Sequence, residues 1–220
     1  MLKQLLILSP LCVVLTACVQ RTLDKVPDDA RVVRVVLKTS EGDITLELDR
    51  EHAPVSTDNF LHHAKAGHYD NTTFQRVIPN FVIQGGSHTP ELINLPESDA
   101  AAGIKDTPIR DEWHNGLKNV KGTVGVGRDT DPDSGTREFY INVADNPKLD
   151  TPREVSGNAG YAVFGRVVLG WDVVEKIRTT PTSTRPEWIR KGKETVMGEN
   201  LKDVPVDLVT VYSVRITATE

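Results

Sequence analysis

The sequence predicts a mostly β domain in which many short antiparallel strands close into a barrel, accompanied by two helices. Runs rich in β-branched and aromatic residues recur between turn residues, whereas a helical spacing of apolar residues occurs in only two segments. No internal repeat of roughly 20 to 50 residues is visible, which argues against a solenoid or a propeller. Because closing a sheet removes its exposed edges, we expect a closed barrel.

The bulk composition is that of an ordinary globular protein. Of the 220 residues, 38% are hydrophobic and 26% are charged, and the formal net charge is −5. This composition excludes a largely disordered chain, and the negative charge argues against nucleic acid as a partner. Both cysteines, Cys12 and Cys18, lie near the N-terminus, so we expect no disulfide bond in the fold.

The N-terminal residues predict an export signal. Lys3 precedes an apolar stretch over residues 5–15, which is interrupted by Pro10 and is shorter than the about 20 residues of a membrane-spanning helix. The end of this stretch, Leu-Thr-Ala-Cys at residues 15–18, resembles the lipobox of bacterial lipoprotein signals. The other interpretation is a plain secretory signal in which Cys18 is incidental.

The lipobox resemblance implies three parts: a signal peptide at residues 1–17, a lipidated Cys18 with a polar tether at 18–30, and a folded domain at 31–218. Acylation by more than one chain would make the membrane anchor stable. Val19 follows the cysteine where an aspartate would retain a lipoprotein at the inner membrane. We therefore expect an exported protein anchored through Cys18 at the periplasmic face of the outer membrane.

The first half of the domain predicts a hairpin, a helix and a second hairpin. Residues 31–48 contain two β-rich runs around the turn residues 40–43. Pro54 begins a helix for which Ser56 or Thr57 is a candidate cap, and Gly67 can end it. Residues 72–86 read as two strands joined by a Pro-Asn turn at 79–80.

The second half of the domain predicts further strands and one more helix. Residues 87–118 show no sustained period and carry no prediction. Three strands are expected within residues 122–127, 138–145 and 160–168, followed by a helix over 171–178. Residues 179–207 read as a long loop with three prolines, and residues 208–218 read as a closing strand.

Arg76 is a charged residue within a run of β-forming residues, FQRVIPNFVIQGG at 74–86. Side chains alternate along a strand, so Val82 and Gln84 share one side, and a tight hairpin would bring Gln84 beside Arg76. An amide oxygen would orient the guanidinium without neutralising it. Taken alone, however, Arg76 also fits a solvent-facing strand residue.

Three separated motifs resemble the cyclophilin family of peptidyl-prolyl cis-trans isomerases. They are YDNTTFQRVIPNFVIQGG at 69–86, KGTVGVGRDTDPDSGTREFYINVADNPKLD at 121–150 and GYAVFGRVVLGWDVVEKI at 160–177. Their order and spacing are those of the family, and the resemblance covers most of residues 32–218. It implies an eight-stranded antiparallel barrel capped by two helices, and an enzyme that needs no cofactor and no metal.

The resemblance also implies the roles of individual residues. Arg76 stands at the catalytic arginine, Gln84 at the residue that orients it, and Phe81 at the aromatic residue of the proline pocket. The substrate-binding positions are Val82, Gly127, Arg128, Asp129, Glu138, Tyr140, Leu149 and Tyr161. Three of these depart from the common family residue: Val82 replaces Met, Glu138 replaces Gln, and Tyr140 replaces Phe. Tyr161 stands where many members have His and bacterial members often have Tyr.

The implied reaction is rotation about X-Pro bonds in proline-containing polypeptides, here exported or envelope proteins whose folding it would assist. The departures at Val82, Glu138 and Tyr140 leave open a proline-binding module with little or no turnover. An unrelated barrel with a chance motif is a third interpretation. We also hypothesise that Glu138 pairs with Arg76, which would lower activity at neutral pH relative to mildly acidic pH.

Two possible metal signals are interpreted as surface features. Residues 129–133 begin like a calcium loop, but Ser134 and Tyr140 stand where that loop needs Gly and a bidentate Glu, so an acidic surface loop is expected. His62 and His63 are adjacent on the predicted helix and would point in different directions. Together with His68 they are therefore interpreted as a solvated helix end.

Overall fold

The structure is a computed structural model that describes residues 26–219 except residue 28 and residues 102–105. The predicted signal peptide and Cys18 lie outside the described residues. Within the described part of the chain, none of the helices has the length and apolar character needed to cross a membrane.

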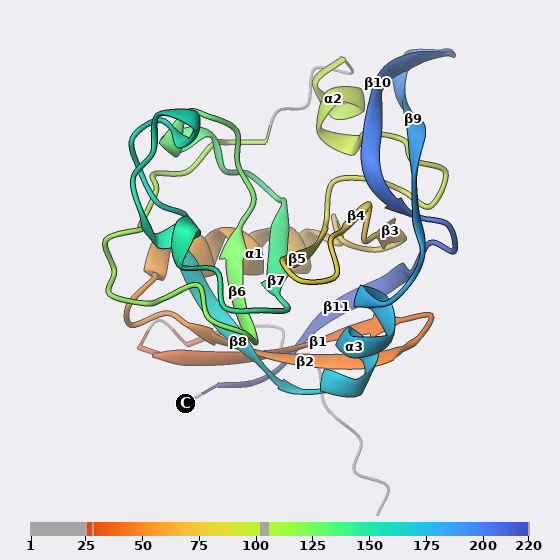
Figure 1. The fold of residues 1–220 in the computed structure, drawn as a ribbon. Helices are drawn as coiled ribbons and strands as arrows, with labels where there is room; N and C mark the ends of the chain where they lie inside the picture. The colour runs from red at the N-terminus through yellow and green to blue at the C-terminus, as the bar shows by residue number, and fades with distance from the viewer. Residues whose placement is uncertain (1–25, 28, 102–105, 220) are drawn as a thin grey trace, which may run out of the picture.

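The chain folds into β-strands with three α-helices and three short 3-10 turns among the described residues (Figure 1). The elements in chain order are β1 Val32–Thr39, β2 Gly42–Asp49, α1 Pro54–Ala66, β3 Thr72–Thr73, β4 Arg76–Val77, β5 Val82–Gly85, α2 Leu95–Ala101, β6 Thr123–Val126, β7 Phe139–Asn142, β8 Val163–Leu169, α3 Trp171–Arg178, β9 Thr182–Lys191, β10 Glu194–Pro205 and β11 Thr210–Thr219. The 3-10 turns span Pro132–Ser134, Pro147–Asp150 and Glu154–Ser156.

Nine strands form one antiparallel sheet in the order β3-β11-β1-β2-β8-β6-β7-β5-β4. Its two end strands, β3 and β4, are consecutive in residues 72–77; β3 pairs with β11 and β4 pairs with β5. This short segment therefore joins the two edges of the sheet and closes it. Counted as one strand, β3 and β4 give the eight-stranded antiparallel barrel that the family resemblance implies.

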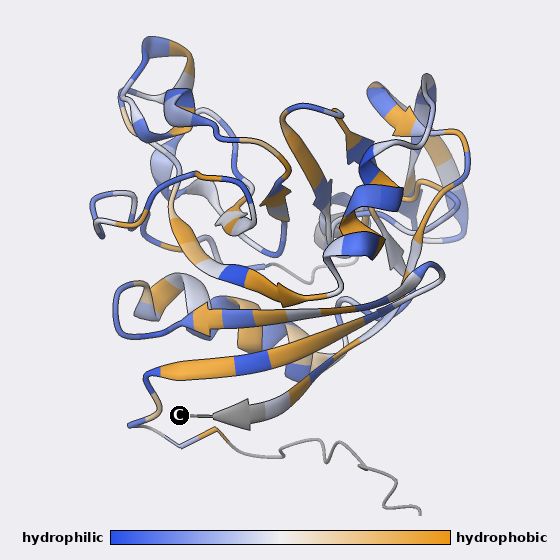
Figure 2. Ribbon diagram, turned by 60° about the horizontal axis from the view of Figure 1, so that its bottom comes forward, coloured by the Kyte–Doolittle hydropathy of each residue, from blue (hydrophilic) through white to orange (hydrophobic). Residues whose placement is uncertain are grey.

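The barrel encloses an apolar core. Most side chains of β1 and β2 are buried against it, with polar residues such as Arg34 and Glu47 on the more exposed side. Figure 2 shows such strands as hydrophobic stretches interrupted by hydrophilic residues. Phe60 of α1 packs against three core rings, those of Tyr69, Phe139 and Phe164, at centroid distances of 4.8 to 5.5 Å. Each aromatic pair contributes roughly 0.5–1.5 kcal/mol beyond its buried area, so α1 is fixed firmly on the barrel.

Helix α1 begins and ends for different local reasons. Pro54 presets the helical φ angle at the first position. Neither Ser56 nor Thr57 caps the helix, so that prediction is wrong: Glu112 accepts hydrogen bonds from the Val55 and Ser56 backbone N–H groups and from the Ser56 hydroxyl. Gly67 ends the helix with φ at 75°, as predicted.

The predicted solvated helix end is also wrong for His63. This side chain is only 3% exposed and its Nδ1 lies 2.8 Å from Nδ1 of His68. Gly67 reverses the chain after α1, and the His68 N–H donates to the His63 carbonyl over 3.0 Å. The turn, which sequence spacing alone does not reveal, folds His68 back onto the helix.

The predicted loop at 179–207 is instead a long hairpin, β9–β10, which projects from the barrel beside α2 (Figure 1). Gly192, with φ at 65°, makes its turn. Trp188 exchanges backbone hydrogen bonds with Leu92 and Asn94, which fixes the hairpin to the preceding loop. Most of its side chains are exposed on both faces, so it lacks the apolar alternation by which strands are recognised.

Candidate active site

Arg76 and Gln84 face each other across β4 and β5. Their Cα atoms are paired in the ladder, and Arg76 Nη1 donates to Gln84 Oε1 over 3.0 Å. This contact confirms the expectation that the hairpin brings Gln84 beside Arg76. The Phe81 ring centroid lies 5.9 Å from the guanidinium carbon. The hydrogen-bond partner of Arg76 among the described residues is the neutral amide oxygen of Gln84, so its charge is oriented but not neutralised.

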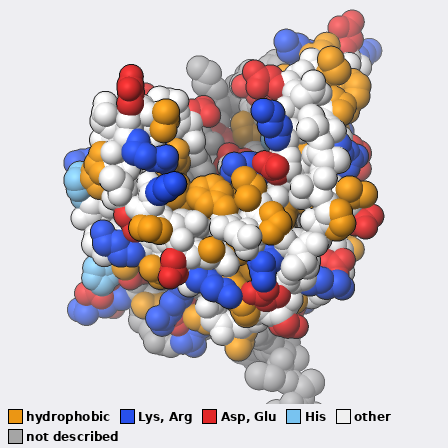
Figure 3. Space-filling model, in the orientation of Figure 1, with side chains coloured by type: hydrophobic (Ala, Val, Ile, Leu, Met, Phe, Trp, Pro, Cys, Tyr) orange, Lys and Arg blue, Asp and Glu red, His pale blue; other side chains and the backbone are white. Residues whose placement is uncertain are grey.

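A cavity of about 210 Å³ opens beside this pair. Hydrophobic side chains gather in the middle of this face, in front of β5 and β7, between two raised sides of the surface (Figure 3). The cavity is lined by Arg76, Phe81, Val82, Gln84, Gly127, Arg128, Tyr140, Leu149, Arg153 and Tyr161. Nine of these ten residues were predicted as site residues; Arg153 was not.

The apolar side of the cavity is a small cluster of its own, outside the barrel core. Val82, Tyr140 and Leu149 are buried together, and Phe81 and Tyr161 pack against them. We call these five residues the pocket cluster. Its members come from β5, β7, a 3-10 turn and two loops. Local sequence patterns do not predict that these residues meet, and only the family resemblance placed them together.

Tyr140 forms a wall of the pocket cluster without leaving its hydroxyl free in the cavity. The hydroxyl donates to Asn119 Oδ1 over 2.7 Å, and burial raises the pKa of Tyr140 well above its ordinary value. The ring occupies the space that a side chain at Gly125 would need: a Cβ there would lie 2.2 Å from Tyr140 Cζ. The phenol is therefore compatible with a dry pocket.

Three asparagines that the sequence analysis missed support this wall. Asn119, 1% exposed, accepts from Tyr140 and from Asn142, and donates to Asp150 and to the Tyr161 carbonyl. Asn146 donates to the Phe81 carbonyl and to Asn142. Asn142 lies within the otherwise apolar run FYIN of β7, and that polar interruption was the available signal.

Arg128 lines the cavity but its side chain is engaged elsewhere. The guanidinium donates to the backbone carbonyls of Asp129 and Ser156, and its Nε lies 3.1 Å from a carboxylate oxygen of Asp111. The Tyr161 ring lies over it, with 4.1 Å between ring centroid and guanidinium carbon. Arg128 therefore holds the loop and the Tyr161 ring in place.

Two predicted site residues, Asp129 and Glu138, do not line the cavity. Glu138 Oε1 accepts hydrogen bonds from Gln75 Nε2 and Ser87 Oγ instead of pairing with Arg76. The hypothesised Glu138–Arg76 pair is therefore absent from the structure, because Gln75, the residue before β4, bonds to Glu138 while Arg76 bonds to Gln84. Asp129 is exposed at the start of the acidic surface loop, as expected for residues 129–133.

A larger cavity of about 600 Å³ lies elsewhere on the barrel, among residues of β2, β6 and β8 and residues 116–122. It contains none of the predicted site residues. The smaller cavity is the better candidate because an oriented, unneutralised guanidinium and an apolar cluster meet there, whereas size alone says nothing about chemistry.

Comparisons with known proteins identify the family of the chain. The sequence model of the family described as cyclophilin type peptidyl-prolyl cis-trans isomerase/CLD matches residues 34–207. A peptidyl-prolyl cis-trans isomerase of Acinetobacter baylyi is 43% identical over 80% of this chain and 83% of its own length. Peptidyl-prolyl cis-trans isomerase B of Escherichia coli is 37% identical over 83% of this chain and 99% of its own length.

Solved structures show the same fold. A cyclophilin-type isomerase of Cryptosporidium parvum superposes with a TM-score of 0.62 at 21% identity, over 86% of this chain and 99% of that one. A second crystal structure of that protein, in the presence of the dipeptide Ala-Pro, superposes with a TM-score of 0.61 over 84% of this chain and 99% of that one.

Proposed function

The chain belongs to the cyclophilin-type peptidyl-prolyl cis-trans isomerases, and we propose that it accelerates rotation about X-Pro bonds in exported or envelope proteins through Arg76 and the pocket cluster. The observation that carries the assignment of the site is the Arg76–Gln84 pair at the edge of an apolar cavity. The Ala-Pro dipeptide present with a similar protein supports a proline-containing substrate.

The reaction needs no covalent step. An X-Pro bond rotates within tens to hundreds of seconds because twisting it breaks amide resonance, at a barrier of roughly 18–20 kcal/mol. In the twisted state the proline nitrogen regains a lone pair. A donor aimed at this nitrogen is therefore rewarded in the transition state and not in the ground state, which is the condition for catalysis.

Arg76 is the donor in this account. Gln84 occupies one of its N–H groups and fixes the plane of the guanidinium, which leaves other N–H groups for the substrate. A hydrogen bond from a charged group contributes roughly 1.5–3 kcal/mol, whereas a millionfold acceleration needs about 8 kcal/mol. Arg76 therefore supplies part of the acceleration, and positioning of the substrate must supply the rest.

The pocket cluster provides that positioning. It offers the proline ring a buried apolar surface made by Val82, Tyr140 and Leu149, with Phe81 beside the guanidinium. The pocket holds the proline ring while the preceding carbonyl rotates. The substrate therefore loses its freedom of movement when it binds, and this loss no longer adds to the barrier of the rotation. The asparagine network behind Tyr140 and Phe81 keeps this surface in one arrangement.

Turnover separates the enzyme from the proline-binding module that remains the alternative role for this site. The purified chain should be mixed with an Ala-Pro peptide, and cis-trans exchange should be followed by NMR magnetisation transfer together with peptide affinity. We expect exchange far faster than in peptide alone. Binding of the peptide by folded protein without faster exchange would reject catalysis at this site.

The envelope location is supported by the lipobox resemblance of residues 15–18. In a Gram-negative host, metabolic labelling with a fatty acid followed by membrane fractionation tests it. We expect label in the wild-type chain, recovered with outer membranes, and none in the Cys18→Ser variant. Equal labelling of both chains, or an unlabelled wild type released as free protein, would contradict lipid anchoring at Cys18.

A further inference from the structure

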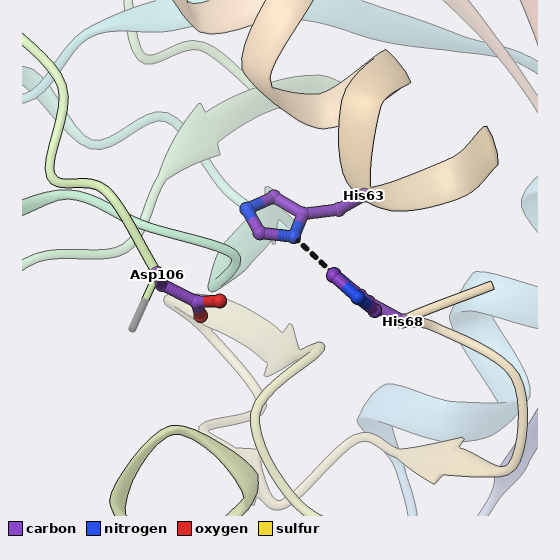
Figure 4. Close-up of side chains that lie close together, drawn as sticks. All are labelled: His63, His68 and Asp106. Carbon is purple, nitrogen blue, oxygen red and sulfur yellow. Dashed lines mark hydrogen bonds between the residues drawn. The ribbon is translucent and has the colours of Figure 1, made fainter. Parts of the chain in front are cut away.

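Two histidines and an aspartate converge at the C-terminal end of α1, apart from the cavity of the active site (Figure 4). His63 comes from the last turn of the helix, His68 from the turn after Gly67, and Asp106 from the segment that follows α2. One ring nitrogen of each histidine and a carboxylate oxygen of Asp106 all lie within 4.8 Å of one another. Histidine and aspartate are both residue types that bind transition metals.

The histidine pair is built as a chelate. The two Nδ1 atoms face each other at 2.8 Å, and the backbone turn that places them is closed by the His68 N–H to His63 carbonyl bond. In a tetrahedral zinc site, with Zn–N bonds of about 2.05 Å, two nitrogens lie about 3.3 Å apart. The rings would therefore have to separate by only about 0.5 Å to hold an ion between them.

Both rings present Nδ1 toward the same point. At 2.8 Å one Nδ1–H donates to the other Nδ1, so an ion between the rings requires that proton to leave this nitrogen, for example by moving to Nε2. Each neutral imidazole then offers an Nδ1 lone pair to the metal. His68 is partly exposed, which gives an ion a path from solvent.

Asp106 keeps a lone pair for a metal even though Arg137 binds it. Arg137 donates to both Asp106 oxygens, at 2.5 and 2.7 Å, and to Asp99 at 2.7 Å. A carboxylate has about four acceptor sites, so each Asp106 oxygen retains one. With two carboxylates and one guanidinium, the formal charge of this group is −2 + 1 = −1, which favours a cation.

We propose that His63, His68 and Asp106 form a binding site for a divalent first-row transition metal, with Zn²⁺ as the best fit. Two imidazoles and one carboxylate suit Zn²⁺, whereas Ca²⁺ and Mg²⁺ take oxygen ligands. Ligands of one ion at about 2.1 Å lie at most about 4.2 Å apart, so Asp106 approaches the ion slightly or contacts it through a water.

The test is zinc titration of the purified full-length chain by isothermal calorimetry. Every sample carries Cys12→Ser and Cys18→Ser and no affinity tag, so that thiols and tag histidines cannot bind the ion. We expect one Zn²⁺ per chain with a micromolar or tighter dissociation constant. His68→Gln should weaken binding by more than the roughly 10- to 100-fold that loss of an outer-shell partner costs.

His62→Gln is the matched control, because His62 is an exposed neighbour outside the converging ligand atoms. It should leave the dissociation constant within about twofold of the parent. Each variant is checked for folding by circular dichroism. Absence of one-to-one binding, an unchanged affinity in folded His68→Gln, or equal losses in both variants would overturn the proposal.

Substitution of Co²⁺ provides a second readout. In the parent chain, d–d absorption bands should report nitrogen and oxygen ligands in a low-symmetry site, and Asp106→Asn should shift or weaken them. Bands that are identical in folded Asp106→Asn would remove Asp106 from the site and overturn the three-ligand proposal.

Discussion

Gly125→Ala probes the wall of the pocket cluster by filling the space under the Tyr140 ring. An alanine Cβ would lie 2.2 Å from Tyr140 Cζ and 2.3 Å from its hydroxyl oxygen. Carbon atoms in contact sit about 3.5–4.0 Å apart, so the ring must move by more than 1 Å. Overpacking of this kind costs about 1–3 kcal/mol of stability. The backbone at Gly125 has no positive φ angle, so the ring displacement is the main effect.

The larger expected effect is on catalysis. A misplacement of about 1 Å in a group that positions substrate costs roughly 100-fold, so we expect kcat/KM on an Ala-Pro peptide to fall by about that factor. The assay is NMR exchange, with thermal unfolding measured in parallel to show that the variant is folded. A folded Gly125→Ala chain whose kcat/KM stays within about threefold of wild type would refute the role of the Tyr140 ring as a pocket wall.

Three further predictions follow from the neighbouring contacts. Tyr140→Phe removes a buried hydrogen bond to Asn119 but keeps the ring, so the free energy of unfolding should fall by about 0.5–1.5 kcal/mol. The value of kcat/KM should stay near wild type, and a large loss of activity would show that the hydroxyl takes part in the reaction. Glu138 bonds to Gln75 and Ser87 and not to Arg76, so wild type and Glu138→Gln should show the same dependence of activity on pH from about pH 5 to 8. If the activity of wild type alone increased toward acidic pH, that result would support a Glu138–Arg76 pair. Burial raises the pKa of Glu187, but hydrogen bonds from His88, Asn94 and the Glu199 N–H outweigh it and hold the pKa below 4.5. Its ionised form therefore stabilises the fold above pH 4.5, and this contribution is lost as the pH falls through the lowered value. Chemical denaturation should find Glu187→Gln less stable at pH 7 and less sensitive to acid, and equal acid sensitivity in both chains would contradict this.

The sequence predicted the barrel and most of the site because both depend on local patterns. Alternation and turn residues placed β1, β2, β5 and β11 close to their observed bounds. The Pro-Asn turn at 79–80 sets the hairpin, and the hairpin sets the Arg76–Gln84 register. The family resemblance then brought residues as distant as Val82 and Leu149 into one pocket cluster, which spacing alone does not do.

The failures depend on contacts between distant segments. The Ser56 and Thr57 cap prediction failed because Glu112, more than fifty residues away, occupies the helix start. The loop prediction at 179–207 failed because β9 and β10 stabilise each other by pairing, with little apolar burial. The histidine interpretation failed because Gly67 returns the chain and brings His68 against His63, a contact that the helical spacing of His62 and His63 does not show.

Comparison of Arg76→Ala with wild type tests the central claim most directly, using cis-trans exchange and affinity for the same Ala-Pro peptide. Loss of a charged hydrogen bond of roughly 1.5–3 kcal/mol predicts a kcat/KM lower by about 10- to 150-fold. Peptide affinity should change little, because the pocket cluster remains. A folded Arg76→Ala chain with kcat/KM within about twofold of wild type would contradict the assignment of Arg76 as the donor to the proline nitrogen.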